Sequence, residues 1–146
     1  AWEFIKKNKF LGMIIPVEYG GLGFSARAHS SVVVKVASRS VAGSVTVMVP
    51  NSLGPGELLH RYGTDAQKHR WLPKLATGEE VPCFALTEPT AGSDAAGMTA
   101  RGIVVKGRNG EPELSLTWDK RYTTLSTIAT VLGLAFNQRG KNKLMG

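Results

Sequence analysis

The amino-acid sequence predicts an α+β chain in which helices come first and short strands follow. The composition changes near Val81-Pro82: the residues before it carry helix start and stop signals, and those after it form short β-patterned runs between turns. Hydrophobic residues make up 42% of the 146 residues and charged residues 20%, which is enough apolar surface to bury a core. We therefore expect a helical part over residues 1–80 and a β part over residues 81–146.

Three helices can be placed in the helical part from local signals. A short one is expected at the very start, from the apolar residues Trp2, Phe4 and Ile5. Another is expected just before Gly63, from the apolar and aromatic residues Leu58, Leu59 and Tyr62. The clearest helix start is Thr64, because Gln67 stands three residues later and completes the spacing of a capping box. Pro73 should kink or divide this third helix, and Gly78 should end it. Its apolar face contains Leu72, Leu75 and Ala76.

The valine-rich stretch over residues 31–49 is ambiguous from its pattern alone. Its end, Val45–Val49, has the β-branched content of a strand. Ser25 is available as a helix cap, and helical spacing runs through the same region in Ala28, Val32, Val36 and Arg39. Periodicity leaves helix and strand equally open here.

The β part begins with a strand over Val81–Leu86 that leads into the turn-rich Glu88–Asp94. Farther on, Gly102–Lys106 and Glu113–Trp118 flank Asn109-Gly110, the strongest short-range signal for a hairpin. In the second strand of this hairpin, apolar residues alternate with Ser115 and Thr117; they are Leu114, Leu116 and Trp118. This alternation predicts that one face of the hairpin is buried.

A glycine-rich run, Gly21–Ala26, fits the G-x-G-x-x-A pattern of a dinucleotide-binding loop. Such a site needs an acidic residue about 20 positions further on to bind the ribose, and no Asp or Glu occurs between Glu18 and Glu57. Pro16 also stands where a central parallel strand would need its amide. We therefore interpret the run as a glycine-rich turn ahead of a helix.

Other classes of site find little support in the sequence. The net charge of +7 favours anionic partners, but the basic residues are dispersed and no aromatic residues alternate with them, which argues against a nucleic-acid-binding domain. The three histidines have no metal-ligand spacing and no Cys or carboxylate cluster completes a site, so no metal site is expected. The lone Cys83 excludes an internal disulfide and a cysteine-rich zinc site. No stretch reaches the ~20 apolar residues of a membrane-spanning helix. Because the chain starts at Ala1 and has no identifiable closing element, we expect an excerpt of a longer protein. The residues Ala1–Phe4 lack the basic start and the apolar run with which a signal peptide would open this chain.

The remaining candidate site is the end of the first predicted strand. The strand delivers Thr87 to its end, and the following Pro/Gly turn exposes backbone N–H groups beside Ser93. Such a turn can bind neutral or anionic acceptors on a ligand.

Four segments, in order along the chain, resemble the acyl-CoA dehydrogenase family. The run Phe84–Asp94, with the sequence FALTEPTAGSD, resembles the family's signature segment. Similar segments surround it at Ile15–Gly23, Tyr62–Glu79 and Lys120–Thr124, the last resembling the strand that lies against the flavin. The continuation, Leu125–Phe136, resembles the large bacterial long-chain branch of the family.

The resemblance implies a fold and a reaction. Residues 1–80 would be the end of an N-terminal all-α domain, and residues 81–146 the start of an antiparallel β middle domain that binds FAD and acyl-CoA. The ambiguous stretch over residues 31–49 would then be helical. The implied activity is oxidation of a long-chain fatty acyl-CoA to the trans-2-enoyl-CoA in fatty acid β-oxidation. FAD carries the redox chemistry, and the protein supplies position and polarity.

The resemblance also implies cofactor-binding residues: Phe84, Ala85, Leu86, Thr87, Gly92, Ser93, Tyr122, Thr123 and Thr124. Thr87 and the backbone of Phe84–Thr87 would contact the flavin ring, and Ser93 would lie by the pyrophosphate and the acyl-CoA. Tyr122 would cover one face of the flavin and Thr124 would bond near N5. A strand would put both on one face, with the Thr123 side chain pointing away.

The resemblance implies no catalytic residue within this chain. The family's catalytic glutamate lies in a C-terminal bundle beyond Gly146, so the excerpt alone should be inactive. Many relatives carry tryptophan where Tyr122 stands and asparagine where Leu125 stands, so flavin contacts can differ here. The implied partners are acyl-CoA, an electron-transfer flavoprotein as acceptor and further copies of the chain, in the cytoplasm or at the inner membrane periphery. The alternative is an inactive family member that binds flavin or acyl-CoA.

Overall fold

The structure is a computed structural model that describes residues 1–52, 54–138 and 144–145, and it divides into two compact units. The first comprises Ala1–Phe84 and Thr124–Leu132, and we call it the helical unit. The second comprises Ala85–Thr123 and Gly133–Gly146, and we call it the strand unit. The chain is thus α+β, with helices before most of the strands, as the sequence predicts.

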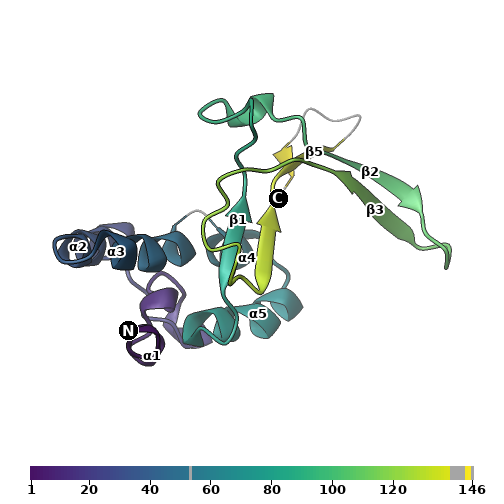
Figure 1. Ribbon diagram of the computed structural model, residues 1–146. Helices are drawn as coiled ribbons and strands as arrows, with labels where there is room; N and C mark the ends of the chain where they lie inside the picture. The colour runs from purple at the N-terminus through teal and green to yellow at the C-terminus, as the bar shows by residue number, and fades with distance from the viewer. Residues whose placement is uncertain (53, 139–143, 146) are drawn as a thin grey trace. The chain divides into compact units, whose positions relative to one another are not determined.

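Five α-helices form most of the part of the helical unit that the structure describes (Figure 1): α1 Trp2–Lys7, α2 Ala26–Ala37, α3 Val41–Met48, α4 Pro55–Tyr62 and α5 Asp65–Thr77. Short 3-10 helices connect them at Phe10–Gly12, Val17–Tyr19 and Val49–Asn51. The predicted short helix at the start and the predicted helix before Gly63 are both confirmed, as α1 and α4.

The predicted cap and stop of α5 are also confirmed. Thr64 Oγ1 accepts from the Gln67 N–H, and Gln67 Oε1 accepts from the Thr64 N–H, so the capping box is complete. Gly78 ends the helix in the left-handed region at φ 73°. Of the two effects predicted for Pro73, a kink stays a prediction and division of the helix is wrong, since α5 continues through it. Core packing explains this, because the buried side chains lie on both sides of the proline: Leu72, Leu75 and Ala76.

The valine-rich stretch forms two helices, α2 and α3, so its strand alternative is wrong and the helical expectation is confirmed. A serine caps each helix: Ser25 Oγ accepts from the Ala28 N–H at 3.3 Å, and Ser40 Oγ accepts from the Gly43 N–H at 3.0 Å. Each cap satisfies a backbone donor that the first helical turn leaves free, so two local signals outweigh the β preference of valine.

The core of the helical unit is a small cluster of almost fully buried side chains: Ile15, Leu72, Leu75 and Ala76. Partly buried residues pack around it, namely Tyr19, Leu59 and Val131. In the full-length protein, we expect Leu72→Ala to lower the unfolding free energy by about 2–5 kcal/mol, because Leu72 is 0% exposed and the truncation leaves a cavity. Leu132→Ala is the control, since Leu132 is 48% exposed. Denaturant unfolding checks both, and an equal loss in the two variants would contradict this assignment of the core.

The glycine-rich run is a turn ahead of α2, as predicted. Its backbone donates back onto the preceding loop: Leu22 to the Gly12 carbonyl at 3.0 Å, and Gly23 to the Ile15 carbonyl at 2.9 Å. A Cβ on Gly21 would overlap the Ile15 carbonyl group, 2.6 Å from its carbon. Close packing of backbone on backbone therefore explains why glycine stands at this position.

Within the described residues, six strands form two sheets: β1 Pro82–Ala85, β2 Arg101–Lys106, β3 Pro112–Thr117, β4 Val131–Leu134, β5 Phe136–Gln138 and β6 Leu144–Met145. β1 pairs with β4, and the other sheet has the order β3-β2-β5-β6. The hairpin prediction is confirmed: β2 and β3 pair antiparallel from Arg101↔Thr117 to Lys106↔Pro112. The sheet is mixed rather than purely antiparallel, because β2 and β5 pair parallel.

The prediction of a buried hairpin face is wrong for the described residues. The alternating apolar side chains of the predicted second strand are exposed: 45% for Leu114, 39% for Leu116 and 47% for Trp118. Alternation fixes which side chains share a face, whereas burial needs another segment to cover that face.

Candidate functional site

The loop that follows β1 is folded on itself by a tight turn. The Glu88 N–H donates to the Ala91 carbonyl at 3.0 Å, and the Ala91 N–H donates to the Glu88 carbonyl at 3.3 Å. Pro89 and Thr90 occupy the exposed tip between them. We call residues 86–93 the strand-end loop.

The Glu88 carboxylate is buried and fully used as an acceptor. Its Oε2 accepts from the Thr99 N–H at 2.6 Å and from the Thr99 hydroxyl at 2.8 Å. Its Oε1 accepts from the Ala100 N–H at 2.8 Å and from Lys120 Nζ at 2.9 Å. Glu88 and Lys120 thus form an ion pair in which both side chains are 1% exposed.

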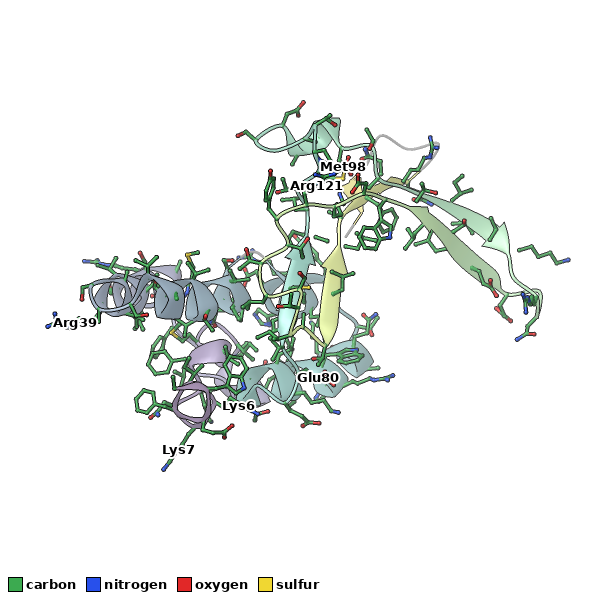
Figure 2. All side chains as sticks on the ribbon, in the orientation of Figure 1. Lys6, Lys7, Arg39, Glu80, Met98 and Arg121 are labelled. Carbon is green, nitrogen blue, oxygen red and sulfur yellow. The ribbon has the colours of Figure 1, made fainter. Side chains whose placement is uncertain are left out.

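Lys120 also joins the strand-end loop to a second segment, residues 118–123. Lys120 Nζ donates to the Leu86 carbonyl at 2.9 Å and lies 3.8 Å from Met98 Sδ. The next residue, Arg121, donates its backbone N–H to the Thr87 carbonyl at 2.9 Å. Met98 and Arg121 are labelled in Figure 2 and mark this part of the strand unit.

The hydrogen bonds determine the charge of this cluster. Burial by itself would raise the pKa of the Glu88 carboxyl, but donors from Lys120, Thr99 and Ala100 outweigh burial and lower the pKa from 4.5 to about 2. Glu88 is therefore a carboxylate at neutral pH with its lone pairs already engaged. Such a group is unsuited to act as a general base.

Neither residue of this ion pair was assigned a role from the sequence. Both lie within segments that resemble the acyl-CoA dehydrogenases, but 32 positions separate them, and no spacing rule connects residues so far apart. The signal that could have found the pair was the opposite charge of two residues, one in each candidate ligand-binding segment: Glu88 in Phe84–Asp94 and Lys120 in Lys120–Thr124.

The exposed side of the strand-end loop presents hydrogen-bond donors. Gly92 and Ser93 are exposed, and a Cβ on Gly92 would meet no atom of the described residues within 4 Å. Among the described residues, the hydroxyls of Thr87 and Ser93 and the N–H groups of Gly92 and Ser93 have no acceptor. Asp94 closes the loop, since its carboxylate caps the short helix Ala95–Gly97 by accepting from the Gly97 N–H at 3.2 Å.

The structure brings most of the predicted cofactor-binding residues into the strand unit. Ala85 is buried, Leu86 and Thr87 are half-buried, and the backbone of Thr87 is bonded to the segment that carries Tyr122 and Thr123. Two predicted residues, Phe84 and Thr124, belong to the helical unit.

The predicted strand over residues 120–124 is absent. The segment is irregular, and Tyr122 adopts the left-handed conformation at φ 57° with 85% of its side chain exposed. The argument that spacing of two puts Tyr122 and Thr124 on one face of a strand is therefore wrong. Hydrogen bonds to the loop hold this segment instead of a strand ladder. Lys120 Nζ donates to the Leu86 carbonyl, and the Arg121 N–H donates to the Thr87 carbonyl.

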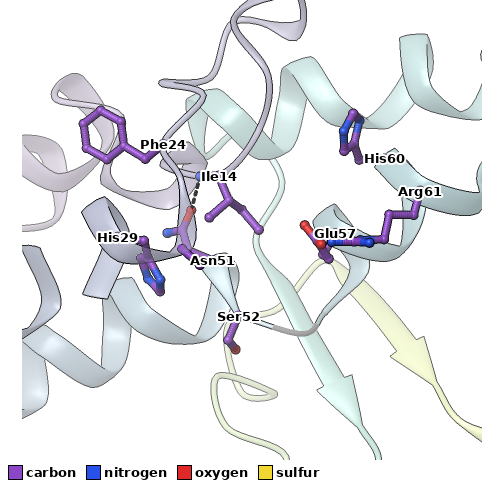
Figure 3. Close-up of a pocket in the computed structure, with 9 residues that line it drawn as sticks. Ile14, Phe24, His29, Asn51, Ser52, Glu57, His60 and Arg61 are labelled. Carbon is purple, nitrogen blue, oxygen red and sulfur yellow. Dashed lines mark hydrogen bonds and ion pairs between the residues drawn. The ribbon is translucent and has the colours of Figure 1, made fainter. Parts of the chain in front are cut away.

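The helical unit contains a separate pocket of about 710 Å³ (Figure 3). Its lining includes two of the histidines that have no metal spacing in the sequence, His29 and His60, together with Asn51, Glu57 and Arg61. Sequence reasoning missed this grouping because the residues come from three different elements.

The polar groups of this pocket are largely satisfied by the protein itself. Asn51 donates to the carbonyls of Phe10 and Val47 and accepts from the Ile14 N–H at 3.1 Å, and Arg61 pairs with Glu57. Among the described residues, His29 Nε2 is buried without a hydrogen-bond partner, and burial lowers the pKa of His29. The pocket therefore offers a neutral imidazole rather than surplus charge, and the strand-end loop remains the stronger candidate.

The described residues contain neither a metal-binding cluster nor a helix able to span a membrane. Residues 1–52, 54–138 and 144–145 contain no group of three or more His, Cys, Asp or Glu side chains able to hold a metal ion. No helix in the same ranges has the length and apolar character needed to cross a membrane.

Comparison with known proteins gives consistent matches. The human mitochondrial very long-chain specific acyl-CoA dehydrogenase is 38% identical over 104 residues, or 70% of this chain and 16% of that protein. A glutaryl-CoA dehydrogenase structure from Mycobacterium smegmatis has a TM-score of 0.82 at 31% identity, over 93% of this chain and 33% of that chain. An acyl-CoA dehydrogenase complexed with FAD from Bacillus anthracis has a TM-score of 0.81 at 28% identity, over 95% of this chain and 23% of that chain.

The chain thus spans between about a sixth and a third of the length of these three proteins. The family model for the N-terminal domain of acyl-CoA dehydrogenases matches residues 1–79, which is more than half of the chain. The chain therefore belongs to the acyl-CoA dehydrogenase family.

Proposed function

We propose that the protein, at its full natural length, is an FAD-dependent dehydrogenase that oxidises a long-chain fatty acyl-CoA to the trans-2-enoyl-CoA in β-oxidation. The observation that carries the proposal is the row of free donors on the strand-end loop, at Thr87, Gly92 and Ser93. Donors without a protein acceptor at an exposed turn suit the pyrophosphate and ring carbonyls of a flavin cofactor.

The family resemblance, supported by the free donors of the loop, assigns the residues that would hold FAD. Gly92 and Ser93 would bind the pyrophosphate, with Ser93 also facing the acyl-CoA. The residues Ala85–Thr87 together with Tyr122 and Thr123 would hold the ring system. Phe84 and Thr124, in the helical unit, stay predictions from the family resemblance. When bound, FAD supplies the two-electron acceptor, and this chain supplies binding and orientation.

The preference for long acyl chains rests on two likenesses. The run Leu125–Phe136 resembles the long-chain bacterial branch, and the human relative acts, by its name, on very long chains. The structural match to a glutaryl-CoA dehydrogenase shows that the same fold serves short substrates too. Initial rates with acyl-CoA of increasing length check the proposal, and it fails if short chains are the better substrates.

Further features of the full-length protein are proposed on family membership. Residues 1–80 end an N-terminal helical domain and residues 81–146 begin the β middle domain. The reduced flavin passes its electrons to an electron-transfer flavoprotein. The protein forms homo-oligomers and is cytoplasmic or peripheral at the inner membrane.

The alternative is an inactive family member that serves as a flavin- or acyl-CoA-binding module, and the strand-end loop fits both the enzyme and the module, because it offers binding groups and no general base. Glu88, the buried acid of the strand-end loop, is fully hydrogen-bonded, so the loop provides no general base. Palmitoyl-CoA with added FAD and an electron-accepting dye discriminates between the two. Turnover by the full-length protein supports the enzyme, and flavin binding without turnover supports the module. Residues 1–146 alone should give no turnover.

Thr87→Val in the full-length protein should weaken FAD binding by about 0.5–1.5 kcal/mol, because it removes one hydroxyl donor while keeping the shape of the side chain. Thr90→Val is the matched control, since Thr90 is an exposed threonine at the tip of the same loop. Equilibrium dialysis measures both affinities. Equal affinities in wild type and Thr87→Val would make the loop a structural turn.

A further inference from the structure

We propose that the buried Glu88–Lys120 ion pair is a positioning pair, which fixes the strand-end loop against residues 121–123 and so sets the geometry of the flavin site. The inference rests on the proposed function, because it needs both segments to contact FAD. Neither residue touches the cofactor in this proposal; each acts through Thr87 and Tyr122.

Three hydrogen bonds donated by Lys120 and Arg121 hold the loop, and their acceptors belong to three successive residues, 86–88. Lys120 Nζ bonds the Leu86 carbonyl and the Glu88 carboxylate, both at 2.9 Å, and the Arg121 N–H bonds the Thr87 carbonyl at 2.9 Å. Thr87 is therefore held at its own carbonyl and at both neighbours. Because Tyr122 follows Arg121 directly, the same contacts place the backbone that carries the tyrosine ring.

The other end of the pair is anchored just as firmly. The Glu88 carboxylate accepts three further bonds, from the N–H and hydroxyl of Thr99 and the N–H of Ala100. Those two residues lead directly into β2, which begins at Arg101. The pair therefore connects the loop, residues 120–123 and the main sheet of the strand unit through directional bonds.

Stability alone gives a weak reason for this arrangement. A buried ion pair is often no more stabilising than well-packed apolar side chains, because both charges lose their hydration. Apolar side chains would leave the Leu86 carbonyl without its donor and would set no fixed distance between the loop and Tyr122. Directional bonds that fix a position are the property that apolar packing cannot supply.

The test uses full-length holoprotein and separates positioning from stability. Lys120→Met removes the charge and the bond to Leu86 with little change of volume. The double variant Glu88→Gln/Lys120→Met removes the unpaired buried charge as well, so its melting temperature should recover relative to the single variant. Lys106→Met is the control, because Lys106 is an exposed lysine on β2 of the same unit.

We expect both Lys120 variants to raise the Kd for FAD about tenfold and to shift the flavin absorption band. The reason is that the Leu86 carbonyl loses the hydrogen bond from Lys120 Nζ in each variant. Lys106→Met should retain the wild-type Kd and spectrum. If the double variant regains both the melting temperature and the wild-type FAD affinity and spectrum, the pair is only structural and the inference is overturned. If Lys120→Met does not fold, the double variant carries the same test.

The outcomes also separate this inference from the proposed function. Wild-type protein that binds no FAD overturns the proposed function and the inference with it. Wild-type protein that binds FAD, with unchanged affinity and spectrum in both Lys120 variants, overturns the inference alone.

Discussion

Replacing Gly21 with alanine should lower the unfolding free energy by about 3 kcal/mol or more, one of the two largest effects expected in this chain. The added Cβ would overlap the Ile15 carbonyl, and it would lie 2.7 Å from the Ile15 Cβ. Relief requires a backbone shift, because the obstacle is main chain rather than the end of a flexible side chain. Ile15 belongs to the core cluster with Leu72 and Leu75, so such a shift would disturb the packing of the helical unit.

Gly56→Ala provides the matched control in the same unit. A Cβ on Gly56 would come no closer than 3.9 Å to its neighbours, and Gly56 lies within α4, where alanine is the better helix former. Denaturant unfolding of the full-length protein should show a large loss for Gly21→Ala and little change or a small gain for Gly56→Ala. A stable Gly21→Ala variant would show that this glycine serves something other than close packing.

Lys120→Met should lower the unfolding free energy at neutral pH by about 3–5 kcal/mol, because it leaves the Glu88 carboxylate buried without its counter-charge. Glu113→Gln, an exposed acid on β3, is the control and should have little effect. Denaturant unfolding of the full-length protein measures both variants. Equal stability of Lys120→Met and wild type would contradict the burial of an ion pair here.

The pH dependence of stability should follow from the same carboxylate. The pKa of Glu88 is about 2 in the folded chain and 4.5 ordinarily, so the folded state favours the ionised form. The resulting stabilisation is fully present above pH 4.5 and is lost as the pH falls toward 2. Without Lys120 one of the donors that lower the folded-state pKa is missing, so in Lys120→Met the acid loss of stability should be smaller and should end at a higher pH than in wild type.

Elements with local signals were the ones that the sequence could predict. The Thr64 and Gln67 side chains form their capping box within one turn of helix, and Asn109-Gly110 needs only the adjacent strands to make a hairpin. The two helices of the valine-rich stretch were ambiguous because the helix cap offered by Ser25 opposes the β preference of the valines, and the spacing pattern alone does not decide between helix and strand.

Features that depend on distant contacts could not be predicted from spacing. The irregular segment around Tyr122 is fixed by bonds to Leu86 and Thr87, far back in the chain, and it therefore departs from the strand that the family resemblance implied. The same holds for the Glu88–Lys120 pair. The candidate site was located by the turn chemistry at Ser93, while the contacts that shape it became visible only in three dimensions.

The exposed β hairpin has a practical consequence for handling this stretch of chain. Among the described strands, β3 lies at one edge of its sheet, so its backbone groups on one side lack strand partners. Leu114 and Leu116 on this strand, and Trp118 just after it, keep more than a third of their surface in water. An outer strand with apolar side chains readily pairs with a second copy of itself. Residues 1–146 produced by themselves should therefore self-associate as their concentration rises, and a lysine in place of Leu116 should keep them in solution.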